Sequence, residues 1–112
     1  MDVDNRTKEI VKGFLEAFNQ EDFISARTFL SNDLKFVGVM GMKDGADTYI
    51  MEMEKMRLKY ELKKIFYDQD GVAAFYDITM DGKKIFSAGW YEIENGKIKS
   101  IKVVFDPRPL LV

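Results

Sequence analysis

Few side chains of this chain could move a proton, because it contains no histidine and no cysteine. The absence of cysteine excludes thiolate metal sites, thiol nucleophiles and thiol redox chemistry. The absence of histidine removes the side chain that most often serves as general acid or base near neutral pH. The remaining candidates are carboxylates and tyrosine hydroxyls in the second half of the chain: Asp77, Asp106, Tyr76 and Tyr91.

Each of these candidates has two readings. Asp77 stands between Tyr76 and Ile78 in a β-forming run, where an unpaired buried carboxylate would have a raised pKa and could act as a general base. Alternatively it points to solvent or pairs with a lysine outside the sheet. Asp106 precedes Pro107, so it is either an acid near a ligand or a turn residue that bonds nearby backbone, and the second is more typical of that sequence.

Other residues could line a binding site in which no reaction is catalysed. Tyr76, Tyr91 and Ser87 could offer hydroxyl donors to a ligand, although buried tyrosines are more often core residues. Methionines are numerous for this length, and thioethers fit varied apolar shapes or fill gaps in a core. They are Met40, Met42, Met51, Met53, Met56 and Met80.

Three turn dipeptides divide the second half of the chain and must position these candidates. Asp70-Gly71, Asp81-Gly82 and Asn95-Gly96 each separate apolar runs and each suits a tight β-hairpin. We therefore expect residues 61–106 to form a four-stranded antiparallel meander. Because helical patterns fill most of the first half, the sequence predicts one α+β domain over residues 1–112 rather than alternating βαβ units.

The first half predicts three helices and one strand. Ile10, Val11, Phe14, Leu15 and Phe18 recur at helical spacing after a cap at Asp4 or Asn5. A shorter apolar stripe over residues 23–30 predicts a second helix. Residues 34–39 are β-prone, and Asp44 is the expected N-cap of a third helix that carries Tyr49, Ile50, Met53 and Met56.

A two-residue turn at Asp81-Gly82 fixes which side chains share a sheet face. One face carries Ala74, Tyr76, Ile78, Ile85, Ser87, Gly89 and Tyr91, and the other carries Phe75, Asp77, Phe86, Ala88 and Trp90. Both faces are apolar enough to be covered, so we expect the helices on the first and a second copy of the chain on the second, as a homodimer. This register favours the interpretation in which Asp77 points outward and is paired.

The register of the last strand stays open, because Asn95-Gly96 could form a two-residue turn or a bulged loop. The two possibilities place Ile101, Val103 and Phe105 on opposite faces of the sheet.

Composition excludes several classes of protein. Charged residues make up 32% and hydrophobic residues 46% of the chain, which argues against disorder, and a net charge of −2 argues against nucleic acid as a partner. No apolar run is long enough to cross a membrane. The acidic start at residues 1–4 is unlike a secretory signal, so we expect a cytoplasmic protein. Asp33, Asp44 and Asp47 lack the spacing of a calcium loop, and we expect neither metal nor cofactor.

Several segments resemble SnoaL-like proteins of the NTF2-like superfamily. These are residues 14–23 (FLEAFNQEDF), 29–36 (FLSNDLKF), 45–50 (GADTYI), 90–93 (WYEI) and 95–98 (NGKI), together with the ending Phe105-Asp106-Pro107. The resemblance covers nearly the whole chain. It implies a cone in which a strongly curved sheet wraps a long helix, an apolar pocket opens at one end, and dimers form through the outer sheet face.

The chain departs from the catalytic members of that superfamily. Ketosteroid isomerases carry a tyrosine and two acids at positions that match Phe14, Gly38 and Gly89, and none of these three residues can transfer a proton. Polyketide cyclases and scytalone dehydratases need a histidine. Limonene epoxide hydrolases place an arginine between two carboxylates, a role that only Lys102 could take here.

Three functions follow for testing. The first is a small-molecule-binding protein that holds an apolar or aromatic ligand among Phe14, Phe18, Met53, Tyr76 and Tyr91, with no clear catalytic constellation. The second is an isomerase or cyclase that uses a non-standard acid or base such as Asp77 or Asp106. The third is a protein-interaction module that uses the exposed sheet face.

Overall fold

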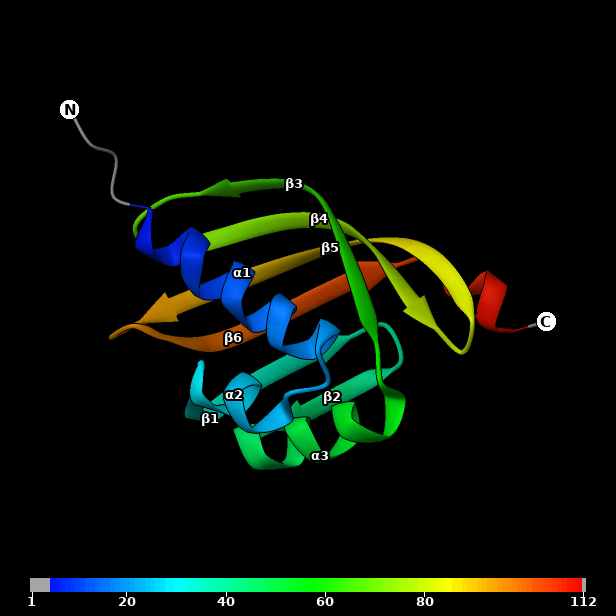
Figure 1. The fold of residues 1–112 in the computed structure, drawn as a ribbon, viewed down its shortest axis with the longest axis horizontal. Coiled ribbons are helices and arrows are strands. Elements are labelled where there is room, and N and C mark those ends of the chain that lie inside the picture. The colour runs from blue at the N-terminus through cyan, green and yellow to red at the C-terminus, as the bar shows by residue number, and fades with distance from the viewer. Residues whose placement is uncertain (1–4, 112) are drawn as a thin grey trace.

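Three α-helices and a six-stranded sheet make up the computed structural model, which describes residues 5–111 (Figure 1). The elements are α1 (Arg6–Asn19), α2 (Phe23–Thr28), β1 (Leu30–Gly38), β2 (Gly41–Asp44), α3 (Ala46–Met56), β3 (Lys59–Tyr67), β4 (Gly71–Met80), β5 (Lys83–Glu94), β6 (Lys97–Phe105) and the short 3-10 helix η1 (Arg108–Leu110). The α+β class predicted from the sequence is confirmed. Among the described residues, no helix is long and apolar enough to cross a membrane.

The strands are ordered β2-β1-β6-β5-β4-β3 in a single curved sheet. The last four strands form the predicted antiparallel meander, and β1 joins it by running parallel to β6. Figure 1 shows α1 lying across one face of the sheet, with α2 and α3 beside β1 and β2. The result is the predicted cone: a curved sheet that wraps around a central helix.

Turn chemistry explains two of the three hairpins. Asp81 and Gly82 have φ of +50° and +75°, the positive values that a tight two-residue hairpin turn demands, and Met80 pairs with Lys83 across it. Asn95 and Gly96 have φ of +53° and +75°. Asp70-Gly71 is different, because Gly71 already belongs to β4 and the Asp68 carboxylate closes the loop by accepting hydrogen bonds from the Asp70 and Gly71 backbone N–H groups.

A β-bulge settles the register of the last strand. Ile93 pairs with Ile98, but Glu92 pairs with Ser100, so Lys99 is the extra residue. Beyond the bulge Tyr91 faces Ile101 and Gly89 faces Val103. Ile101, Val103 and Phe105 therefore lie on the helix-covered face, which the sequence left open.

The first half differs from expectation at three boundaries. The second helix ends at Thr28, and β1 begins at Leu30, whose side chain is buried under the helices. The third helix is capped by Gly45 at φ +93° rather than by Asp44, because Asp44 pairs with Lys35 in the unforeseen strand β2. Asn5 is the N-cap residue of α1 without a side-chain bond, and Asp4 lies outside the described residues.

The two sheet faces divide as the strand alternation predicts. The inner face of β4 and β5 is buried together with α1, as the side chains of Ala74, Tyr76, Ile78, Ile85, Ser87 and Tyr91 show. On the outer face Phe86 is 62% exposed and Trp90 is 50% exposed. The core therefore lies between the concave face and the helices.

Candidate functional site

An apolar cavity of about 460 Å³ opens at one end of the cone. Its lining residues belong to β1 and the β1–β2 turn, the end of α3 and the α3–β3 turn, the start of β3, the end of β4 and the β4–β5 turn, the end of β6 and η1. Figure 1 shows where these elements lie. The lining residues are Phe36, Met40, Met53, Lys55, Met56, Leu58, Tyr60, Ile78, Met80, Asp81, Val103, Phe105 and Leu110. A volume of this size lies within the range of natural small-molecule sites.

The cavity walls carry few polar groups. Apart from Tyr60, Lys55 and Asp81, all the lining side chains are aliphatic, aromatic or thioether groups. Lys55 and Asp81 are exposed, whereas Tyr60 is buried. The site therefore combines an apolar interior with two opposite charges at its rim.

Tyr60 belongs to a cluster of four buried tyrosines that links the cavity to the core. The rings of Tyr60 and Tyr76 meet edge to face with centroids 5.0 Å apart, and the Tyr76 and Tyr91 hydroxyls share a hydrogen bond of 2.6 Å. Burial raises the pKa of each of the four, Tyr49 included, well above the ordinary tyrosine value. At neutral pH these hydroxyls are therefore neutral donors and not bases.

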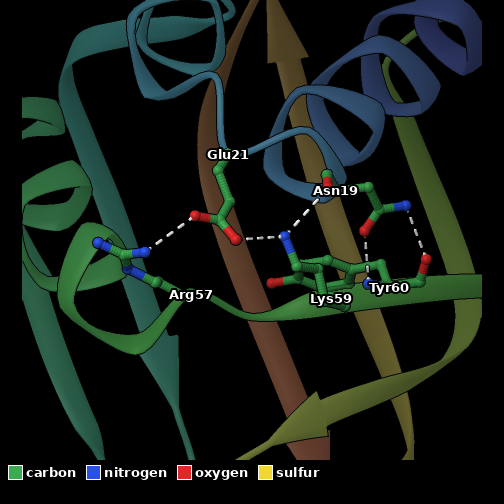
Figure 2. Close-up of polar contacts among 5 residues, drawn as sticks. All are labelled: Asn19, Glu21, Arg57, Lys59 and Tyr60. Carbon is green, nitrogen blue, oxygen red and sulfur yellow. Dashed lines mark hydrogen bonds and ion pairs between the residues drawn. The ribbon is translucent and has the colours of Figure 1, made fainter.

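The start of β3 is held in place by a corner network of Asn19, Glu21, Arg57, Lys59 and Tyr60 (Figure 2). The Asn19 amide donates to the Tyr60 carbonyl (2.8 Å), and its Oδ1 accepts from the Tyr60 N–H (2.7 Å). The Glu21 carboxylate contacts Lys59 Nζ at 2.8 Å and Arg57 at 3.2 Å. The hydrogen bond and charge of Lys59 lower the pKa of Glu21. The network thus fixes the chain where Tyr60 enters the cavity wall.

The structure divides the five predicted ligand residues into two groups. Met53 lines the cavity. Phe14, Phe18, Tyr76 and Tyr91 are buried within the core, where the Phe14 and Phe18 rings lie 4.8 Å apart and Tyr49 stacks on both. The cavity therefore lies closer to the open end of the cone than the predicted group.

Sequence reasoning missed most of the cavity wall. Phe36 and Tyr60 were not singled out, and Phe105 was left without a face because the register of β6 was open. The one usable signal was the set of methionines, of which Met40, Met53, Met56 and Met80 line the cavity while Met42 and Met51 do not.

Both candidate acids are paired with basic residues, and neither is among the residues that line the cavity. Asp77 lies on the outer sheet face opposite Phe86, 3.7 Å from Lys63 Nζ, which matches the paired reading. Asp106 forms a turn in which its carboxylate accepts hydrogen bonds from the Arg108 backbone and guanidinium, and these bonds lower its pKa. Neither carboxylate lines the cavity.

Of the three positions that match the isomerase residues, one is filled by Phe14, and the two glycines leave no room for a side chain without movement of their neighbours. Phe14 packs in the core, and a Cβ added at Gly38 would come within 2.8 Å of the Phe36 ring. A Cβ at Gly89 would overlap the Tyr76 hydroxyl and approach Tyr91 Cε1 to 2.9 Å. Lys102, the substitute considered for an epoxide hydrolase arginine, lies over the Trp90 ring at 4.7 Å on the outer face.

A larger hollow of about 570 Å³ lies at the other end of the fold, near the start of α1. Most of its lining residues are polar or charged, among them Arg6, Asp70, Glu92, Glu94 and Lys99. Among the described residues, no group of three or more His, Cys, Asp or Glu side chains is placed to hold a metal ion. The smaller cavity is the better candidate because its apolar walls can desolvate a ligand.

Comparisons with solved structures identify the fold. The chain is 39% identical to an NTF2-like protein of unknown function from Cytophaga hutchinsonii, over 100% of this chain and 98% of that one, with a TM-score of 0.93. It is 21% identical to an LEH-like epoxide hydrolase from M. tuberculosis, over 96% and 87% of the two chains, with a TM-score of 0.79. An NTF-2 like protein of unknown function from Burkholderia xenovorans shares 16% identity over 91% and 84%, with a TM-score of 0.81.

No protein-family model and no curated protein matches the chain. The structural matches at low identity show the fold alone, whereas the Cytophaga protein is similar in both sequence and structure along its full length. The chain therefore belongs to the NTF2-like superfamily, as its resemblance to SnoaL-like proteins of that superfamily predicts.

Proposed function

We propose that this protein binds a compact apolar or aromatic small molecule in the cavity at the open end of the cone. The observation that carries the proposal is the cavity itself, about 460 Å³ in volume, with only Lys55, Asp81 and Tyr60 contributing polar groups. Transfer of apolar ligand surface from water into such a site is favourable by about 25 cal/mol per Å². Adaptable methionine side chains favour a ligand of irregular shape.

The arrangement supports binding more than proton transfer. Asp77 and Asp106 are paired with cationic side chains and do not line the cavity. Tyr60, which lines it, has a raised pKa because it is buried. Phe14, Gly38 and Gly89 occupy the isomerase positions, so the isomerase or cyclase alternative receives no support from these groups.

A matched pair of variants tests the site. Val103 lines the cavity and is nearly buried, whereas its neighbour Val104 points to the opposite face and is exposed. A screen of steroids, small aromatics and fatty acids should find at least one compound that raises the Tm of the wild type. Val103→Phe should fill the cavity and reduce that shift, and Val104→Phe should leave it unchanged.

Two outcomes would refute the proposal. One is a screen in which no apolar compound binds; the other is equal binding by wild type and Val103→Phe. Turnover of a bound ketone at a rate above background, abolished by Tyr60→Phe, would favour the enzymatic alternative.

We further propose that the outer sheet face forms a homodimer. This face is built from Phe66, Phe75, Phe86, Ala88, Trp90 and Val104, flanked by Lys63, Lys84, Lys102, Glu61 and Asp77. The Phe75 and Phe86 rings stack with centroids 6.3 Å apart, so the centre of the face is apolar. Because the rim carries both signs of charge, two copies can meet about a two-fold axis with opposite charges facing each other. A different protein as partner is the competing occupant.

A further inference from the structure

Four of the methionines share the cavity wall but differ in their access to solvent. Met53 and Met80 are 7% and 6% exposed, whereas Met40 and Met56 are 66% and 46% exposed. The two accessible thioethers thus stand between bulk water and the buried part of the wall. Met40 lies in the turn between β1 and β2, and Met56 is the last residue of α3.

Both positions are set by short segments. The β1–β2 turn contains only Val39 and Met40 between paired strands, since Gly38 pairs with Gly41. Met56 precedes Arg57, whose left-handed φ of +50° ends the helix and whose guanidinium is held by Glu21 (Figure 2). These connections fix the backbone of Met40 and Met56 beside the cavity that both residues line.

We propose that Met40 and Met56 are oxidation sites through which peroxide weakens ligand binding in the cavity. In the reaction the thioether sulfur attacks one peroxide oxygen, the O–O bond breaks and an S–O bond forms. The sulfur loses two electrons and becomes a sulfoxide, while hydrogen peroxide is reduced to one water after proton transfer to the departing oxygen. Methionine sulfoxide reductases reverse this modification.

The effect on binding follows from the chemistry of the wall. A sulfoxide is polar and accepts hydrogen bonds, so a bound apolar ligand would have to desolvate it without offering a donor in return. The other lining groups next to it are apolar except for Tyr60, Lys55 and Asp81. Oxidation of both residues should therefore weaken binding of an apolar ligand by about tenfold. This inference rests on the proposed binding function.

The chain supplies its own controls. Met42 and Met51 are 69% and 63% exposed, which is close to the 66% of Met40 and above the 46% of Met56, but they do not line the cavity. Their oxidation should be equally fast and should leave binding unchanged. Comparing the two pairs of methionines therefore separates the effect of solvent exposure from the effect of a position in the cavity wall.

The experiment measures affinity for a fluorescent apolar probe, N-phenyl-1-naphthylamine, before and after limited treatment with hydrogen peroxide. Peptide mass spectrometry reports the oxidised fraction of each methionine, and the dose is chosen so that Met53 and Met80 stay reduced. The variants are Met40→Leu/Met56→Leu and Met42→Leu/Met51→Leu, in which leucine keeps apolar volume and cannot be oxidised.

We expect the wild type and Met42→Leu/Met51→Leu to lose affinity after oxidation, and Met40→Leu/Met56→Leu to keep it. Treatment with a methionine sulfoxide reductase should restore binding to the wild type. Unchanged affinity with Met40 and Met56 fully oxidised would overturn the inference while leaving the binding function intact. Loss of affinity in Met40→Leu/Met56→Leu equal to that of the wild type would overturn it as well. If the reduced wild type does not bind the probe or any compound of the screen, the proposed function fails and this inference fails with it.

Discussion

At the scale of single residues, the structure requires a glycine at position 89, because a side chain there would occupy the space of the Tyr76 hydroxyl. This hydroxyl lies on the inner face and bonds the Tyr91 hydroxyl at 2.6 Å. Both tyrosines are fully buried, so this shared bond satisfies two polar groups that water cannot reach. The acid that isomerases carry at the matching position would have to displace the tyrosine pair.

We predict that Gly89→Ala lowers the free energy of unfolding by about 1–3 kcal/mol, because the new methyl overlaps the Tyr76 hydroxyl. Urea denaturation measures the change. In a Tyr76→Phe background, where that hydroxyl is absent, the same substitution should cost less. An equal cost in both backgrounds would show that the overlap is not the cause.

The four buried tyrosines also predict the response to alkali. Their pKa values are raised in the folded state by burial, so the neutral form is favoured there. Stability is therefore full below the unfolded tyrosine pKa of about 10 and is lost as the pH rises above it. In a Tyr67→Phe variant, which retains only these four tyrosines, tyrosinate absorbance should appear together with unfolding. Ionisation of a native-like fold, seen by circular dichroism, would contradict this.

At the scale of elements, the corner network joins two connections that are distant in sequence. It ties the α1–α2 turn to the α3–β3 turn, and each turn contains a non-glycine residue with positive φ, Glu21 at +55° and Arg57 at +50°. The Asn19 side chain forms hydrogen bonds with both the backbone N–H and the backbone carbonyl of Tyr60, as a neighbouring strand would. The exposed ion pairs of Glu21 add little by comparison.

We predict that Asn19→Ala lowers the free energy of unfolding by about 1–3 kcal/mol, because two backbone groups of Tyr60 lose their partner in a partly buried site. Probe binding should weaken as well, since Tyr60 lines the cavity. Gln20→Ala is the control, because Gln20 is exposed and, within residues 5–111, its side chain bonds Glu16 alone. Equal effects of the two substitutions in urea denaturation would count against the role of Asn19.

At the scale of the whole molecule, the curved sheet presents two unlike faces. The concave face is closed by α1 and the core, and the convex face leaves Phe86, Trp90 and Val104 exposed. A contiguous apolar patch of this kind on a protein surface usually marks an interface. The cavity and the proposed dimer face therefore lie on opposite sides of the same strands.

We predict that the wild type sediments as a dimer and that Trp90→Glu shifts it to monomer, because the charge would be buried at the centre of the interface. Ile24→Glu is a matched control, since Ile24 is 85% exposed on α2, on the helical side of the sheet. A wild type that is monomeric at every concentration tested would remove the dimer proposal and favour a different partner for this face.

The sequence by itself determined the three helices, the strands of the meander and the faces of the central strands. Alternation with period two assigned Tyr76 and Phe75 to opposite faces, and Asp81-Gly82 fixed the pairing of β4 with β5. These signals are local, because side-chain direction and turn conformation depend on a few neighbouring residues. The superfamily was predicted from the resemblance of several segments to SnoaL-like proteins, and the order of the same elements agrees with it.

The tertiary structure alone decided the cavity and the details that shape it. The extra residue Lys99 put Ile101, Val103 and Phe105 inside, and β2 paired with β1 through residues whose pattern gave no strand signal. The cavity wall comes from elements that are far apart in sequence, with Phe36 on β1, Tyr60 on β3 and Leu110 in η1. Their meeting depends on how strongly the sheet curves and on where the core stops filling it. Curvature and packing are sums over many long-range contacts, so no local pattern of residues encodes them.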